Sequence, residues 1–169
     1  PRRVSAYVSV FELFSIGVGP SSSHTVGPMR AARDFAGRLG EDLPLVARVE
    51  CVLYGSLGAT GIGHGTPDAV VVGPLGEQPE TVDPDLVRGA WSDWPEGRAL
   101  RVNGSHDVPF AKADVVFAPR TRLPGHPNAM TLRALDAHGV TLSAETYYSV
   151  GGGFIRREGE AEAIAAHEY

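Results

Sequence analysis

Apolar positions recur with a helical period between Gly27 and Leu39, which predicts an amphipathic helix there. The apolar face of this segment carries five side chains: Met29, Ala32, Phe35, Ala36 and Leu39. Arginine and aspartate side chains cover most of the remaining positions. Pro28 fits the first turn of a helix better than its interior, so the helix should begin near Gly27.

Alternating and β-branched patterns later in the chain predict strands. The longer strands are expected at 129–135 and 140–150, joined by the hairpin-type turn "DAHG". Shorter strands are expected at 46–54, 99–102, 108–110 and 115–118. The segment "PDAVVVGPLG" predicts a short helix with Pro67 in its first turn, although its valine run also suits a strand. Residues 9–14 predict a short helix or turn.

Helices that come early and antiparallel strands that come late predict an α+β fold. We expect a mixed, largely antiparallel sheet with helices on one face. The length of 169 residues suits one domain, and the net charge of −5 gives no electrostatic support for a nucleic-acid partner. The apolar stretches are too short to span a membrane, and the N-terminus lacks the features of a signal peptide.

The chain has one cysteine, Cys51, within an expected strand. A single cysteine excludes an internal disulfide and a self-contained thiolate cluster, and it fits a reducing compartment such as the cytoplasm. We therefore expect Cys51 to be a buried, inert thiol. The chain starts at Pro1 and ends in a charged, alanine-rich segment, from which we expect a piece of a longer polypeptide.

Three glycine-rich stretches stand apart from the core-forming segments: "GVGPSSSHTVGP", "GSLGATGIGHGT" and "SVGGGFI". Glycine allows the backbone to approach a ligand closely. Hydroxyl groups beside a helix start favour an anion, such as a carboxylate or a phosphate. The alternative for Ser21, Ser22 and Ser23 is that they cap the helix and form a turn.

Three histidines are candidates for acid–base chemistry. His24 lies in the serine stretch and His64 lies between glycines in the second stretch, where we expect a loop exposed in a cleft. His126, in "LPGHPNAM", ranks lower. The alternative for each is an ordinary surface or core histidine. A zinc site made by these three is conceivable, but none of them has a local ligand spacing. A nucleotide site has no lysine to support it.

These motifs resemble a known family. The stretches "SVFELFSIGVGPSSSHTVGPMRAA", "YGSLGATGIGHGT" and "YYSVGGGF" are similar to the β domain of bacterial iron–sulfur L-serine dehydratases. The resemblance runs from about Ser9 to Phe154. It implies residues 1–155 as the β domain and 156–169 as a linker towards a cluster-binding α domain. The β domain is also similar to the allosteric substrate-binding domain of some D-3-phosphoglycerate dehydrogenases.

The family converts L-serine to pyruvate and ammonia with a [4Fe–4S] cluster, one iron of which binds the substrate hydroxyl as a Lewis acid. The resemblance implies that the cluster cysteines belong to the absent α domain, that this chain binds no cluster alone and that it is then inactive. A homodimer is plausible for the family.

The resemblance also implies roles for individual residues. The segment 21–25, with Ser21, Ser22, Ser23, His24 and Thr25, would line the pocket and hold the carboxylate of serine. His64 would be the base or its hydrogen-bond partner, and His126 would be a second active-site histidine. The three glycines of the last motif would allow the backbone to approach the site: Gly151, Gly152 and Gly153.

One departure from the family pattern concerns the acidic residue. The family commonly has Gly-His-Gly-Thr-Asp, whereas this chain has Pro67 in the aspartate position and Asp68 next. The acidic partner is therefore left unassigned. Two hypotheses stay open: an enzyme domain that supplies substrate-binding and proton-transfer residues, or an allosteric serine-binding or subunit-contact module without catalytic residues.

Overall fold

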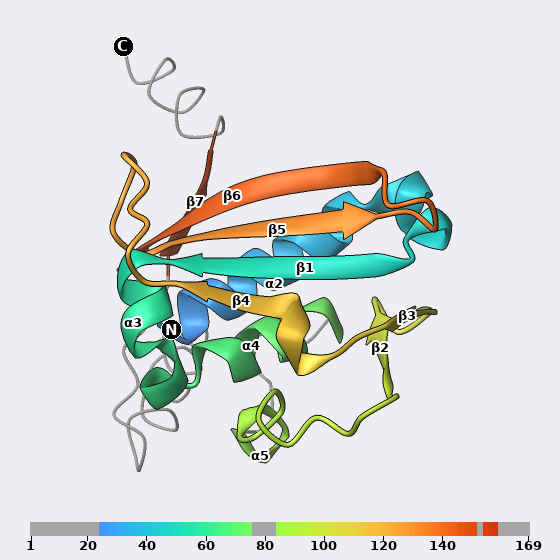
Figure 1. Ribbon diagram of the computed structural model, residues 1–169, viewed down its shortest axis with the longest axis horizontal. Coiled ribbons are helices and arrows are strands. Elements are labelled where there is room, and N and C mark those ends of the chain that lie inside the picture. Colours follow the sequence, from blue (N-terminus) through green and yellow to red (C-terminus); the bar gives the residue numbers. More distant parts are fainter. Residues whose placement is uncertain (1–23, 76–83, 152–153, 159–169) are drawn as a thin grey trace, which may run out of the picture.

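A computed structural model describes residues 24–75, 84–151 and 154–158 of the chain. Its main feature is a five-stranded sheet in the order β4-β1-β5-β6-β7 (Figure 1). β1 and β4 are parallel, and the other neighbouring pairs are antiparallel. The strands of this sheet are β1 (Arg48–Tyr54), β4 (Val115–Ala118), β5 (Ala129–Leu135), β6 (Thr141–Gly151) and β7 (Phe154–Arg157). The expected mixed, largely antiparallel sheet is confirmed.

Helix α2 (Val26–Arg38) covers one face of the sheet and lies behind it in Figure 1. Its predicted apolar face is buried, with Phe35 2% exposed and Met29 fully buried. Alternation along β1 turns Val49, Cys51 and Leu53 towards this helix and into the core. The predictions of this helix and of the buried Cys51 are confirmed.

A second group of elements lies beside α2 and below the sheet in Figure 1. Helix α4 (Thr66–Val72) confirms the predicted short helix, with Pro67 in its first turn, and the 3₁₀ segment η2 (Gly73–Leu75) follows. The strands β2 (Ala99–Val102) and β3 (His106–Pro109) form a separate antiparallel pair. The remaining short elements are η1 (Gly40–Leu45), α5 (Pro84–Val87) and η3 (Lys112–Asp114).

The glycine-rich stretch after β1 differs from the prediction, because it forms helix α3 (Gly55–His64) rather than a loop. The physical reason is a close approach between this helix and the strands. A Cβ atom added at Gly58 would lie 2.6 Å from the backbone oxygen of Leu53 and 3.0 Å from the nitrogen of Pro119. Glycine is thus needed here for packing and not for loop freedom.

The strand expected at 140–150 is confirmed as β6, but a further strand that the sequence did not predict follows it. β6 runs through Ser149 to Gly151, and β7 then pairs with β6 as an edge strand. β7 includes the first residues of the segment expected to be a linker, while 159–169 lie outside the described residues. The expected helix or turn at 9–14 also lies outside them. The domain division and the likeness to the dehydrogenase domain stay predictions.

Candidate functional site

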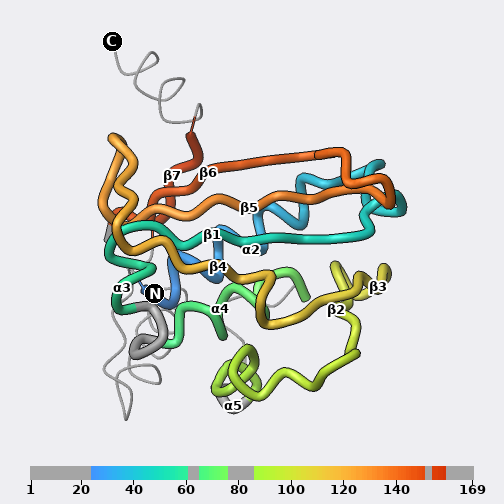
Figure 2. Tube along the Cα trace, in the orientation of Figure 1, coloured from blue at the N-terminus to red at the C-terminus, as the bar shows by residue number. Residues whose placement is uncertain are grey.

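Several of the predicted site residues gather at one end of the sheet, on the left in Figures 1 and 2. Here β1, β4 and β6 end, β5 begins, and α3 starts directly after β1. The loop 119–128, which carries His126, crosses this end. Ser21, Ser22, Ser23, Gly152 and Gly153 lie outside the described residues. Gly151 is the last residue of β6, so its backbone belongs to this end of the sheet.

His24 is buried, with 8% of its surface exposed, and its ring is directed at helix α3. Its Nε2 atom lies 3.2 Å from the Oγ atom of Ser56 and 3.1 Å from the Oγ1 atom of Thr60. The expected exposure of His24 in a cleft is therefore wrong, and its burial with two partners fits the alternative of a core histidine with satisfied hydrogen bonds. The ring is held by two hydroxyl groups that stand one helical turn apart.

The backbone around His24 is also fixed. The Thr66 hydroxyl donates a hydrogen bond to the carbonyl oxygen of His24. The carbonyl oxygen of Thr25 accepts from the N–H of Met29 at 3.1 Å, within the first turn of α2. Thr25 and Thr66 are 2% and 0% exposed, so both hydroxyl side chains are buried. The start of α2 is thus tied to the start of α4.

Ser56 connects the His24 segment to the His126 loop. Its side chain contacts His24, and its backbone N–H donates to the carbonyl oxygen of Pro127 at 3.3 Å. Sequence reasoning missed Ser56, Thr60 and Thr66. The signal was present, because Ser56, Thr60 and His64 are spaced by four residues, but this spacing places them on one face only if the stretch is a helix.

His64 is the last residue of α3. The four-residue spacing places position 64 on the helix face that carries Ser56 and Thr60, one turn beyond Thr60. His64 thus ends the helix whose Ser56 and Thr60 side chains contact His24. The expected position in a loop is wrong, since the residue belongs to a helix.

His126 is half-buried, and its Nδ1 atom accepts a hydrogen bond from the N–H of Asn128 at 3.0 Å. The neighbouring Ser149 offers an unused polar atom. Ser149 is 2% exposed, and its Oγ atom has no hydrogen-bond partner among the described residues. Alternation along β6 places Ser149 on the same sheet face as Tyr147, whose hydroxyl reaches Asp34 of α2. A buried hydroxyl without a partner is unusual and marks a position that a ligand could satisfy.

Asp68, which the sequence left unassigned, has a structural role. Its carboxylate accepts from the backbone N–H groups of Trp91 at 2.7 Å and of Gly89 and Ser92 at 3.3 Å. These bonds fix the segment that follows α5 against the first turn of α4. They engage both oxygen atoms of the carboxylate.

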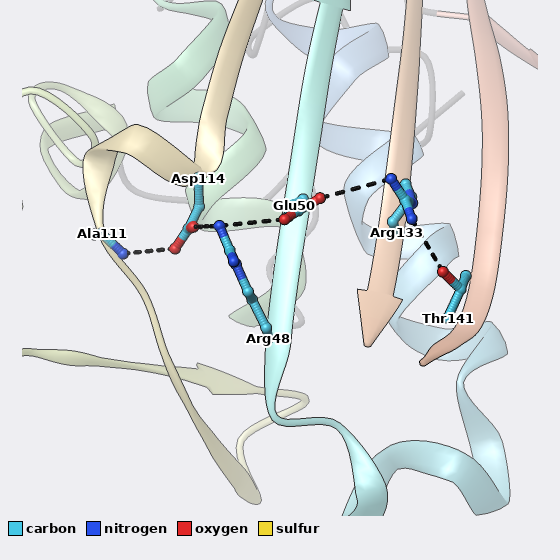
Figure 3. A network of polar contacts seen from close by, with 6 residues as sticks. All are labelled: Arg48, Glu50, Ala111, Asp114, Arg133 and Thr141. Carbon is cyan, nitrogen blue, oxygen red and sulfur yellow. Dashed lines mark hydrogen bonds and ion pairs between the residues drawn. The ribbon is translucent and has the colours of Figure 1, made fainter. Parts of the chain in front are cut away.

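A network of charged residues lies at the opposite end of the sheet, on the face that α2 does not cover (Figure 3). The Nη2 atom of Arg48 lies 3.2 Å from the Oε1 atom of Glu50 and 3.2 Å from the Oδ1 atom of Asp114. The Nη1 atom of Arg133 lies 3.9 Å from the Oε2 atom of Glu50. The arginine side chains are 58% and 43% exposed, so these pairs add little stability. The network ties β1 to η3 and to β5, and it lies away from the His24 end.

The described residues contain no group of three or more histidine, cysteine, aspartate or glutamate side chains that could hold a metal ion. Burial raises the pKa of the Cys51 thiol, which disfavours a thiolate there. None of the described helices is long and apolar enough to cross a membrane.

Comparison with known proteins identifies the family. The family model described as "Serine dehydratase beta chain" matches residues 9–160. The chain belongs to the serine dehydratase β-chain family. This match covers all three glycine-rich stretches, and it confirms the resemblance that the motifs carried.

Individual relatives agree with this family. The chain is 53% identical to an L-serine dehydratase from Streptomyces coelicolor over 151 residues, which are 88% of this chain and 33% of that protein. It is 46% identical to an L-serine dehydratase from Mycobacterium bovis over 153 residues, which are 89% of this chain and 33% of that protein. L-serine dehydratase 1 from Escherichia coli is 43% identical over 164 residues, which are 95% of this chain and 36% of that protein. The chain thus spans about a third of the length of these serine dehydratases.

Proposed function

We propose that this chain is the β domain of an L-serine dehydratase, a carbon–nitrogen lyase that converts L-serine to pyruvate and ammonia. The observation that carries this proposal is the gathering of the family's motifs at one end of the sheet. The His24 ring, the Ser56 and Thr60 hydroxyls, the His126 loop and Gly151 come from four separate parts of the chain. Ser56 contacts both the His24 ring and the His126 loop.

The proposed work of this chain is to bind and orient L-serine and to move its α-proton. The segment 21–25 would hold the carboxylate, and the glycines 151–153 would let the backbone approach it. His64 would take the α-proton or hold the group that does. Loss of the α-proton and of the β-hydroxyl group gives aminoacrylate, which tautomerises and is hydrolysed to pyruvate and ammonia. The buried Oγ of Ser149 is free among the described residues to bind the substrate.

The residues of this chain do not fit a [4Fe–4S] cluster. The sequence has one cysteine, and Cys51 is buried in β1 with a raised pKa. We therefore propose that the cluster is held by the α domain in the remaining part of a longer polypeptide, and that the chain alone is inactive. We further propose a homodimer and a cytoplasmic location, the latter because the single cysteine suits a reducing compartment.

The test uses both the longer polypeptide and the isolated chain. The longer polypeptide, with its cluster assembled without oxygen, should form pyruvate from L-serine, and the isolated chain should form none. Pyruvate formation by the isolated, metal-free chain would contradict the proposal that catalysis requires a cluster held by the α domain. L-Serine binding by the longer polypeptide without turnover would instead favour an allosteric serine-binding module.

A further inference from the structure

The hydrogen bond within the His126 loop determines which ring nitrogen of His126 carries the proton. A backbone N–H can only donate, so the Nδ1 atom that faces the N–H of Asn128 at 3.0 Å must present its lone pair. The neutral ring then carries its proton on Nε2. The Nδ1 atom is thus engaged within the loop, and Nε2 is the ring nitrogen that can face a ligand.

His24 differs from His126 in where its Nε2 atom points. Thr60 uses its single hydroxyl hydrogen on the carbonyl oxygen of Ser56 at 2.9 Å. Its Oγ1 atom must therefore accept from the Nε2–H of His24 at 3.1 Å. The Nε2–H group of His24 is therefore already bonded to Thr60. The Nε2 atom of His126, in contrast, has no hydrogen-bond partner within 24–75, 84–151 and 154–158.

The backbone of the His126 loop is held at several points. Arg156 donates to the carbonyl oxygen of Gly125 at 3.2 Å and stacks on the Tyr148 ring, with 5.2 Å between the guanidinium carbon and the ring centroid. The Tyr148 ring lies so close to Gly125 that an added Cβ would come within 2.4 Å of it. Ser149 also donates its N–H to the carbonyl oxygen of Asn128 at 2.8 Å. β6 and β7 thus hold the backbone of the loop on both sides of His126.

We propose that His126 is a fixed, neutral Nε2–H donor to an oxygen atom of bound L-serine, and that it is not the base. This proposal rests on the proposed function. Arg156 and Tyr148 hold the backbone of the loop that carries His126. A donor that is held in place before binding loses little entropy when the ligand arrives, which suits it to a carboxylate or hydroxyl oxygen.

Two substitutions at His126 separate a donor from a base. Glutamine places an amide N–H near the position of Nε2 but cannot accept a proton at working pH, whereas alanine removes the donor. In the cluster-loaded longer polypeptide, we expect His126→Gln to keep kcat/KM within about tenfold of wild type. We expect His126→Ala to lose about 100- to 1,000-fold, the range for loss of one preorganised donor. His138→Gln, in the exposed turn at the other end of the sheet, is the matched control and should be unchanged.

The pH profile and the ring nitrogens give two further readouts. Both limbs of the pH profile of kcat/KM should keep their positions in His126→Gln. Loss of one limb in this variant would overturn the proposal. Equal losses of kcat/KM in the glutamine and alanine variants would also overturn it. Nitrogen-15 NMR of histidine-labelled wild-type polypeptide should show the His126 proton on Nε2. A proton on Nδ1 would overturn the proposal even if the protein forms no pyruvate, and wild-type inactivity alone would refute only the proposed function.

Discussion

The Nε2 atom of His24 lies 3.2 Å from the Oγ atom of Ser56, and the N–H of that same serine binds the carbonyl oxygen of Pro127 at 3.3 Å. One residue at the start of α3 therefore joins the segment before α2 to the loop between β4 and β5. These segments are about a hundred residues apart in the sequence. The candidate site depends on this junction.

Ser56→Ala tests the junction. The substitution removes one hydrogen bond to His24 and keeps the N–H bond to Pro127, so we expect a loss of about 1 kcal/mol in the free energy of unfolding. Turnover in the cluster-loaded polypeptide should fall by more than this loss of stability explains, because His24 is less firmly oriented. Denaturant unfolding and pyruvate formation measure the two effects. Ser105→Ala, in an exposed turn, is the control. Wild-type turnover in Ser56→Ala would contradict the role of the junction.

Gly58→Ala tests why the second glycine-rich stretch is a helix packed on the strands. The new methyl group would overlap the backbone oxygen of Leu53, which lies 2.6 Å from the added Cβ. We expect a destabilisation of about 1–3 kcal/mol, measured by denaturant unfolding. Gly37→Ala is the matched control, because Gly37 lies in α2 with nothing within 4 Å of an added Cβ. It should stabilise the chain by about 0.5–1 kcal/mol. Equal stabilisation in both variants would contradict the close approach.

Much of the fold followed from periodicity and turn chemistry. Three local patterns predicted elements that the structure contains: the helical period around Phe35, the "DAHG" turn and the alternation of β5 and β6. The helix α3 could not be predicted, because glycine disfavours helices locally and the close approach of Gly58 to Leu53 and Pro119 is visible only in the folded chain. β7 was missed because edge pairing with β6 is a tertiary contact.

The candidate site was predictable only in part, because its motifs identify single residues and not the contacts between them. The motifs named His24, His64 and His126, but the sequence showed neither Ser56 as the link between two of them nor Ser149 as a buried hydroxyl without a described partner. Hydrogen-bond partners far apart in the chain depend on the fold. The role of Asp68 likewise appears only when the segment 89–92 is seen to fold back onto it.

Asp68→Ala should loosen the segment 89–92. Three backbone N–H groups would lose their acceptor, which should cost about 1–3 kcal/mol in the free energy of unfolding. Asp68→Asn keeps one acceptor oxygen and should fall between wild type and the alanine variant. Limited proteolysis between Gly89 and Ser92 should become faster in the same order. Unchanged proteolysis and stability in Asp68→Ala would contradict the structural role.

Tyr147→Phe tests the contact between β6 and α2 through its pH dependence. Burial, and then the hydrogen bond to Asp34 at 2.6 Å, raise the pKa of the Tyr147 phenol above its usual value. The fold thus favours the neutral phenol, and this stabilisation is present below about pH 10 and is lost as the pH rises further. Wild type should exceed Tyr147→Phe by about 1 kcal/mol near pH 8, and the difference should shrink above pH 10. A constant difference across this range would contradict the assignment.

We propose that this chain supplies proton-transfer residues to a serine dehydratase. His64→Ala in the longer polypeptide, with its cluster assembled, tests this proposal. The measurement is pyruvate formation from L-serine, with His138→Ala as the matched control. We expect His64→Ala to lose at least 100-fold in turnover while L-serine binding is kept, because a general base contributes about 10²- to 10⁴-fold. Near-wild-type turnover would contradict the claim and leave this chain a serine-binding or subunit-contact module.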